Sequence, residues 1–145
     1  MHAAAQGSTG TEVTVSQPKA QLWAGRVISG IVVVFLVFDG VTKVGKESHV
    51  LAAAAGQGYS QSLIVWIGAL LLVCTLIYAI PRSSVLGAIL LTGYLGGAVE
   101  SNVRIHHPVF ECIFPVIFGA LVWAGLFLRD VGLRKMIPLR QDQLP

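Results

Sequence analysis

The amino-acid sequence predicts an all-α integral membrane protein, an antiparallel bundle of four transmembrane helices. Apolar residues make up 54% of the 145 residues and charged residues only 12%, whereas a soluble domain carries roughly 25% charged residues. The sequence also holds four long apolar runs without the alternation of barrel strands. Each run approaches the roughly 20 residues that cross about 30 Å of hydrocarbon. Since backbone groups in lipid must be satisfied internally, we expect these runs to be helices.

The four predicted spans are bounded by charged residues or proline. They cover residues 22–38 with an extension to 42, residues 62–80, residues 84–99, and residues 109–128. Asp39 and Glu100 end the first and third runs, Pro81 stops the second, and Arg129 closes the fourth. Together they predict one transmembrane domain over residues 22–130.

The connecting and terminal segments differ in character. The turn Pro81-Arg82-Ser83 is tight, which makes the second and third spans antiparallel neighbours. The connector 42–61 is long and contains four consecutive alanines at 52–55, so it has room for a short interfacial helix. Residues 1–21 are polar and predict a disordered tail, and residues 131–145 form a basic tail.

The distribution of Lys and Arg predicts that both termini face the cytoplasm. The side with both termini carries Lys19, Arg26, Arg82, Arg129, Arg134, Lys135 and Arg140, and the other side carries Lys43, Lys46 and Arg104. No basic run with interleaved aromatic residues indicates a nucleic-acid surface. The expected partners are therefore the lipid bilayer and, on a packing face, a protein partner or a second copy.

Ionisable residues gather at the predicted non-cytoplasmic end of the bundle. Asp39 and Lys43 are four residues apart, as are Glu100 and Arg104, so in a continuing helix each acid faces its base. Charges at a membrane boundary normally face the bundle interior or a wet cavity. We therefore predict a polar pocket in which Asp39 and Glu100 serve as acid or base and Lys43 and Arg104 bind a ligand. The alternative, that helix-end charges only mark the interface, stays open.

The third span supplies the apolar candidates for this pocket. Gly93 and Gly97 are four residues apart and leave a flat helix face, which suits close approach of a neighbouring helix. The same two glycines would form the floor of the pocket. Tyr94 lies well inside the span, where it either lines a quinone or lipid pocket or packs in the core.

Two further groups invite site hypotheses. His106, His107 and Glu111 are candidate ligand-binding residues. A metal site normally needs three or four convergent ligands, so a solvated, interfacial histidine pair is the expected interpretation and no metal is predicted. Cys74 and Cys112 lie at different predicted depths, which argues against a disulfide between them.

Several motifs resemble those of the DoxX-like family of small membrane proteins. They are the stretch Phe38-Asp39-Gly40-Val41-Thr42-Lys43, the run from Leu91 to Val99, Arg104, Phe114-Pro115, and the stretch from Trp123 to Arg129-Asp130. The resemblance covers about residues 23–130. It implies a four-helix membrane bundle and association with redox or thiol-stress complexes, but it supplies no shared catalytic motif.

Three functions remain open from the sequence. The first is a redox-associated membrane protein whose pocket binds a quinone, a thiol or another small lipophilic molecule. The second is a noncatalytic subunit that anchors or stabilises a larger complex, with the Gly93 and Gly97 face and the basic tail as contact surfaces. The third is a stand-alone enzyme that uses Asp39 or Glu100 for acid/base chemistry on a lipophilic substrate. No motif identifies a cofactor, although a quinone fits the first hypothesis.

Overall fold

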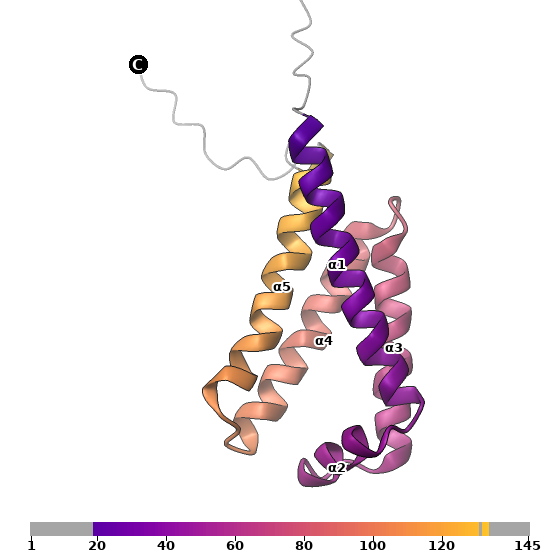
Figure 1. Cartoon of the computed structure of the whole chain (residues 1–145), viewed down its shortest axis with the longest axis vertical. Helices are drawn as coiled ribbons and strands as arrows, with labels where there is room; N and C mark the ends of the chain where they lie inside the picture. The colour runs from indigo at the N-terminus through magenta and orange to yellow at the C-terminus, as the bar shows by residue number, and fades with distance from the viewer. Residues whose placement is uncertain (1–18, 131, 134–145) are drawn as a thin grey trace, which may run out of the picture.

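The computed structural model describes residues 19–130 and 132–133, and every element in that part of the chain is a helix. The helices are α1 (Lys19–Val44), α2 (Ser48–Gly56), α3 (Gln61–Ala79), α4 (Ser84–Arg104) and α5 (Val109–Arg129). All but α2 are long and apolar enough to cross a membrane. The predicted all-α fold with four spanning helices is therefore confirmed (Figure 1).

Two helices are longer than the apolar runs that predicted them. α1 begins at Lys19 rather than at residue 22, and α4 continues past Glu100 to Arg104. Within this extension, the Ser101 hydroxyl donates to the Gly97 carbonyl at 2.9 Å. A helix does not end where its lipid-facing run ends, since polar residues can continue it into the interface. The predicted tails 1–21 and 131–145 lie outside the described residues, apart from residues 19–21 and 132–133.

The ends of α3 follow from local chemistry. Ser60 precedes the helix and accepts a hydrogen bond from the Leu63 amide at 3.3 Å, which is the arrangement of an N-cap. The helix ends one residue before Ile80, whose backbone is extended ahead of Pro81, as expected for a residue that precedes proline. The predicted connector 42–61 contains α2, whose position at the membrane interface stays a prediction.

The four long helices form a ring in which each contacts two others. α1 packs on α3 and α5, and α4 also packs on α3 and α5. Figure 1 shows that α1 lies beside α5 near the chain ends and beside α3 near α2, because it crosses the bundle obliquely. In the same view α4 leaves α3 after their connecting turn and approaches α5. Two helix pairs, α1 with α3 and α4 with α5, therefore separate toward the end that carries α2, which we call the α2 end.

Glycines permit the closest helix crossings. A Cβ on Gly25 of α1 would lie 2.8 Å from the Arg129 amide nitrogen, and one on Gly87 of α4 would lie 2.3 Å from the Tyr78 backbone. Gly40 and Gly68 face each other where α1 crosses α3, since a Cβ on Gly68 would lie 3.0 Å from the Gly40 carbonyl oxygen. Backbones approach closely at these points, as in other membrane bundles.

Within the described part of this chain, no neighbouring helix packs closely on Gly93 and Gly97, so their role as a contact face for a partner stays a prediction. A Cβ built on either glycine meets no atom within 4 Å. The sequence spacing favours a flat face, but α4 diverges from α3 as it runs away from their connecting turn (Figure 1). The two glycines therefore border open space rather than a helix crossing.

The core lies nearer the chain ends, where the ring is tight. Tyr78 is fully buried there, donates to the Val122 carbonyl at 3.0 Å and shares a 3.1 Å hydrogen bond with Ser29. Many large apolar side chains instead point outward, including Trp66, which is 74% exposed, and Val34, which is 71% exposed. An outer surface of this kind suits hydrocarbon rather than water.

Candidate functional site

A cavity of about 530 Å³ occupies the space between the two separating helix pairs. All four long helices and the segment after α2 contribute to its wall. Its charged and polar lining comprises Asp39, Lys43, Gln57, Tyr59, Tyr94, Glu100, Ser101 and Asn102. The remaining wall is aromatic, aliphatic or glycine. Its volume falls in the range of about 300–1,000 Å³ that is usual for small-molecule sites.

An ion pair on α1 stands at the polar end of the cavity. Lys43 Nζ and Asp39 Oδ2 form a salt bridge one helical turn apart, with side chains that are 20% and 35% exposed. The pair also lines a second hollow of about 340 Å³ beneath α2. Because the two charges neutralise each other, the pair offers hydrogen-bonding capacity without a net charge.

Tyr94 is a further polar residue of the cavity lining. Its ring packs against the core cluster, while the residue also lines the cavity wall. Among the residues that the structure describes, no hydrogen bond to its hydroxyl is found. A phenol in apolar surroundings usually finds a partner, so this hydroxyl is available to a ligand.

Three phenylalanines form the opposite wall. The Phe35 ring of α1 lies 4.3 Å from the Phe118 ring and 5.5 Å from the Phe114 ring, centroid to centroid, both on α5. Phe114 and Phe118 lie 4.8 Å apart, one helical turn from each other. The cluster closes the gap between α1 and α5 and gives the cavity an aromatic surface.

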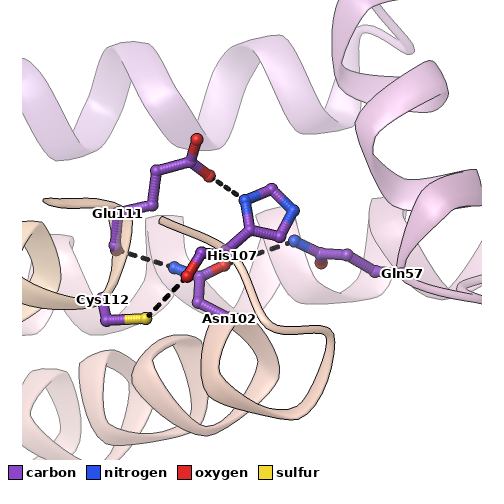
Figure 2. A network of polar contacts seen from close by, with 5 residues as sticks. All are labelled: Gln57, Asn102, His107, Glu111 and Cys112. Carbon is purple, nitrogen blue, oxygen red and sulfur yellow. Dashed lines mark hydrogen bonds and ion pairs between the residues drawn. The ribbon is translucent and has the colours of Figure 1, made fainter. Parts of the chain in front are cut away.

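A strap of hydrogen bonds crosses the α2 end of the cavity. Tyr59 Oη lies 2.6 Å from Ser101 Oγ, and Gln57 Nε2 donates to Asn102 Oδ1 at 3.4 Å. Asn102 in turn donates to the Glu111 carbonyl of α5 at 2.8 Å (Figure 2). These contacts connect the segment after α2 to α4 and α5, which otherwise separate from α1 and α3.

The Asn102 contact has a specific cause in α5. Pro115 lies within that helix and has no amide hydrogen to donate to the carbonyl four residues earlier. That carbonyl belongs to Glu111, and the Asn102 side chain supplies the missing donor. Proline in a membrane helix is tolerated when a neighbouring helix satisfies the freed carbonyl in this way.

The structure brings six of the ten sequence-predicted site residues to one cavity. They are Asp39, Lys43, Gly93, Tyr94, Gly97 and Glu100. Arg104, His106, His107 and Glu111 do not line it. The predicted pair of Glu100 and Arg104 is loose, with 4.0 Å between Oε1 and Nε, and both side chains are more than half exposed.

The side chains of His107 and Glu111 pair with each other and do not line the cavity. Figure 2 shows the His107 ring directed at the Glu111 carboxylate, while the Cys112 thiol faces the His107 carbonyl oxygen. Within the described ranges, no three His, Cys, Asp or Glu side chains gather as a metal site would require. Cys74 and Cys112 are both free thiols.

Sequence reasoning missed the strap and the aromatic wall. Phe114 and Phe118 share one helix face by their spacing, a signal that could have marked them. Gln57, Tyr59 and Asn102 carry no such signal, because their partners lie far away in the sequence, as with Tyr59 and Ser101, 42 residues apart.

The comparison with protein families decides which family this fold represents. The family model of the DoxX-like family matches residues 27–125, well over half of the chain. The chain belongs to the DoxX-like family. The four apolar helices of this DoxX-like protein make it an integral, multi-pass membrane protein surrounded by a lipid bilayer. Comparisons with curated proteins and with solved structures gave no match.

Proposed function

We propose that this DoxX-like protein binds a small, uncharged, lipophilic molecule in the cavity between its helix pairs. The observation that carries the proposal is the composition of the wall: an aromatic and aliphatic surface whose few polar residues include the Asp39–Lys43 ion pair and Tyr94. Apolar walls with few polar groups are typical of small-molecule sites. The apolar surface supplies affinity, and the polar groups orient the ligand.

The charges of the wall disfavour an anionic ligand. Asp39 and Lys43 cancel, and Glu100 leaves one negative charge, which the more exposed Arg104 partly balances from outside the cavity. An anion would meet no uncompensated positive charge in the wall, so it would lose its hydration without an equivalent replacement. A neutral head with hydrogen-bond acceptors avoids this cost.

A quinone is the redox molecule that best fits these requirements. Its two carbonyl oxygens are acceptors, and the wall offers donors in the Tyr94 hydroxyl and the Lys43 ammonium. Its ring is flat and suits the phenylalanine wall. A redox association is what the family resemblance implies, and quinone binding would give the bundle a role in a redox complex.

The proposal is tested by equilibrium binding of duroquinone to the protein in lipid nanodiscs. Tyr94→Phe removes one hydroxyl and should weaken binding about two- to tenfold, as expected for a lost hydrogen bond of about 0.5–1.5 kcal/mol. Lys43→Met should also weaken binding. Arg104→Met is the matched control, because Arg104 likewise follows an acid by four residues yet lies outside the cavity.

The variants distinguish ligand binding in the cavity from binding elsewhere at the α2 end. Unchanged affinity in Tyr94→Phe and Lys43→Met, or equal weakening in Arg104→Met, would contradict the proposal. Thermal unfolding of each variant identifies any loss of fold. Tyr94→Phe keeps the ring and therefore carries little risk of unfolding.

A further inference from the structure

We propose that the cavity takes an amphiphile with an uncharged head and one apolar chain, and that this ligand enters sideways from the bilayer between α3 and α4. The inference rests on the proposed function, since it concerns the same cavity. It adds the chemical class of the ligand and its route. The gaps between the helices around the cavity differ in how they are closed, and these differences indicate the route.

Two of the gaps between helices are closed by packing. Between α1 and α5 the ring of Phe35 fills the space against Phe114 and Phe118. Between α1 and α3 the crossing at Gly40 and Gly68 leaves no room for even a Cβ. A ligand cannot pass through either gap without separating packed helices.

The gap between α4 and α5 is also bridged along its length. Trp123 Nε1 donates to Thr92 Oγ1 at 2.9 Å, and a Cβ on Gly119 would lie 3.8 Å from the Leu95 side chain. Nearer the α2 end, Asn102 binds the Glu111 carbonyl. These contacts hold the two helices together at three levels.

The strap restricts the mouth at the α2 end. Tyr59 and Ser101 are joined at 2.6 Å, and Gln57 and Asn102 at 3.4 Å, so side chains cross the direct path from the water-facing surface. A ligand that entered here would have to break both hydrogen bonds. The strap thus favours a route from another side.

Among the described residues, no hydrogen bond joins α3 to α4 at the level of Gly93 and Gly97, which lies between the strap and the connecting turn. Gly93 and Gly97 line the cavity and are exposed, and a Cβ added to either would meet no atom within 4 Å. Across the gap, Leu70 lines the cavity and is nevertheless 55% exposed. The helices are close near their connecting turn, where Gly87 packs on Tyr78, and they diverge below it (Figure 1).

The opening lies at the depth of the hydrocarbon. Gly97 and Gly93 precede Glu100, the charge that ends the apolar run of α4, by three and seven residues, or about 4 and 10 Å at 1.5 Å per residue. A bilayer has about 30 Å of hydrocarbon, so the gap lies just inside the boundary at Gly97 and reaches the acyl chains at Gly93. Only a molecule dissolved in the bilayer reaches the cavity by this route.

The same geometry defines the shape of the ligand. Its head lies near Tyr94 and the Asp39–Lys43 pair, where the polar groups of the wall are found. An attached chain leaves between Gly93 or Gly97 and Leu70, into lipid. The chain of the bound ligand stays in hydrocarbon, so binding includes no transfer free energy for moving it out of the bilayer. The site can therefore bind a long-chain molecule without a tunnel for the chain.

The route is tested with leucine at the two lining glycines. Gly93→Leu and Gly97→Leu add a side chain in open space and replace a poor helix former with a good one, so folding should persist. The association rate of the decyl analogue of duroquinone, measured by stopped flow in nanodiscs, should fall at least about tenfold. Gly96→Leu is the matched control, since Gly96 is equally open and exposed but does not line the cavity.

The readouts distinguish this inference from the function on which it rests. If the wild-type protein binds neither duroquinone nor its decyl analogue, the proposed function fails. If it binds both and Gly93→Leu and Gly97→Leu keep the wild-type association rate, or slow no more than Gly96→Leu, binding stands and the lateral route is wrong.

Photolabelling locates the chain independently of rate. A decyl analogue with a diazirine at the chain end should label α3 and α4 near Leu70 and Gly93 more than α1 and α5 near Val34 and Ile117, which are also lipid-exposed. Equal labelling of the two faces, or preferential labelling of α1 and α5, would overturn the inference. Excess tail-less duroquinone should reduce only the labelling that depends on the site.

Discussion

At the scale of single residues, the structure separates glycines that look alike in the sequence. Gly25, Gly87 and Gly125 lie where backbones touch, whereas Gly30 and Gly93 border open space. Spacing alone pointed to Gly93 and Gly97 as the packing pair, because it reveals a flat face but not which helix lies opposite. The packing glycines depend on crossing points, which are set by partners distant in the sequence.

Alanine substitution should divide the glycines accordingly. In Gly87→Ala the new methyl carbon would lie 2.3 Å from the Tyr78 backbone, so the two helices must move apart. Overpacking of this kind costs about 1–3 kcal/mol. Gly30→Ala is the control, because it meets nothing within 4 Å and gains about 0.5–1 kcal/mol of helix stability. Thermal unfolding in detergent measures both, and equal stability of the two variants would contradict the assigned packing.

The polar residues of the site show what spacing can predict. Asp39 and Lys43 pair within one helix, so their spacing of four predicted the contact that the structure shows. Glu100 and Arg104 have the same spacing but form only a 4.0 Å contact on an exposed surface. Spacing contains no measure of exposure, which distinguishes the partly buried Asp39–Lys43 pair from the exposed Glu100–Arg104 pair.

At the scale of helices, the existence of the spans follows from hydropathy, while their ends do not. Residues 62–80 predicted α3 to within one residue at each end, since Ser60 caps it and Pro81 stops it. α4 lacks such a stop after its apolar run and continues to Arg104. Its last turn carries Ser101 and Asn102, which form the strap, so the extension missed by hydropathy positions part of the site.

The hydrogen bond from Asn102 of α4 to the Glu111 carbonyl of α5 predicts that substitutions at Asn102 and Pro115 change the stability non-additively. Asn102→Ala leaves the Glu111 carbonyl without the donor that Pro115 fails to supply, and should destabilise the protein by about 1 kcal/mol. In a Pro115→Ala background the helix regains its own amide donor, so Asn102→Ala should cost much less. A double-mutant cycle of unfolding free energies measures the difference. Additive costs would contradict this account of the Asn102 contact.

At the scale of the whole molecule, the lipid environment determines both the fold and the place of the cavity. An outer surface of exposed apolar side chains, such as Trp66 and Phe110, requires hydrocarbon around the four long helices. The few charges then gather at helix ends, as the sequence predicted for the end with Asp39 and Glu100. The sequence predicted a polar pocket at this end but not its shape. The shape arises from the oblique crossing of α1 and the divergence of α4 from α3 (Figure 1).

The most direct test of the account is whether duroquinone binds saturably to the protein in nanodiscs beyond its partition into empty nanodiscs. We predict saturable binding that is lost in Ala98→Phe, which fills the cavity from α4, and retained in Ala124→Phe, where the alanine is exposed on α5 outside the cavity. Uptake by the wild-type protein that never exceeds that of empty nanodiscs, or binding that survives in Ala98→Phe, would contradict the central claim.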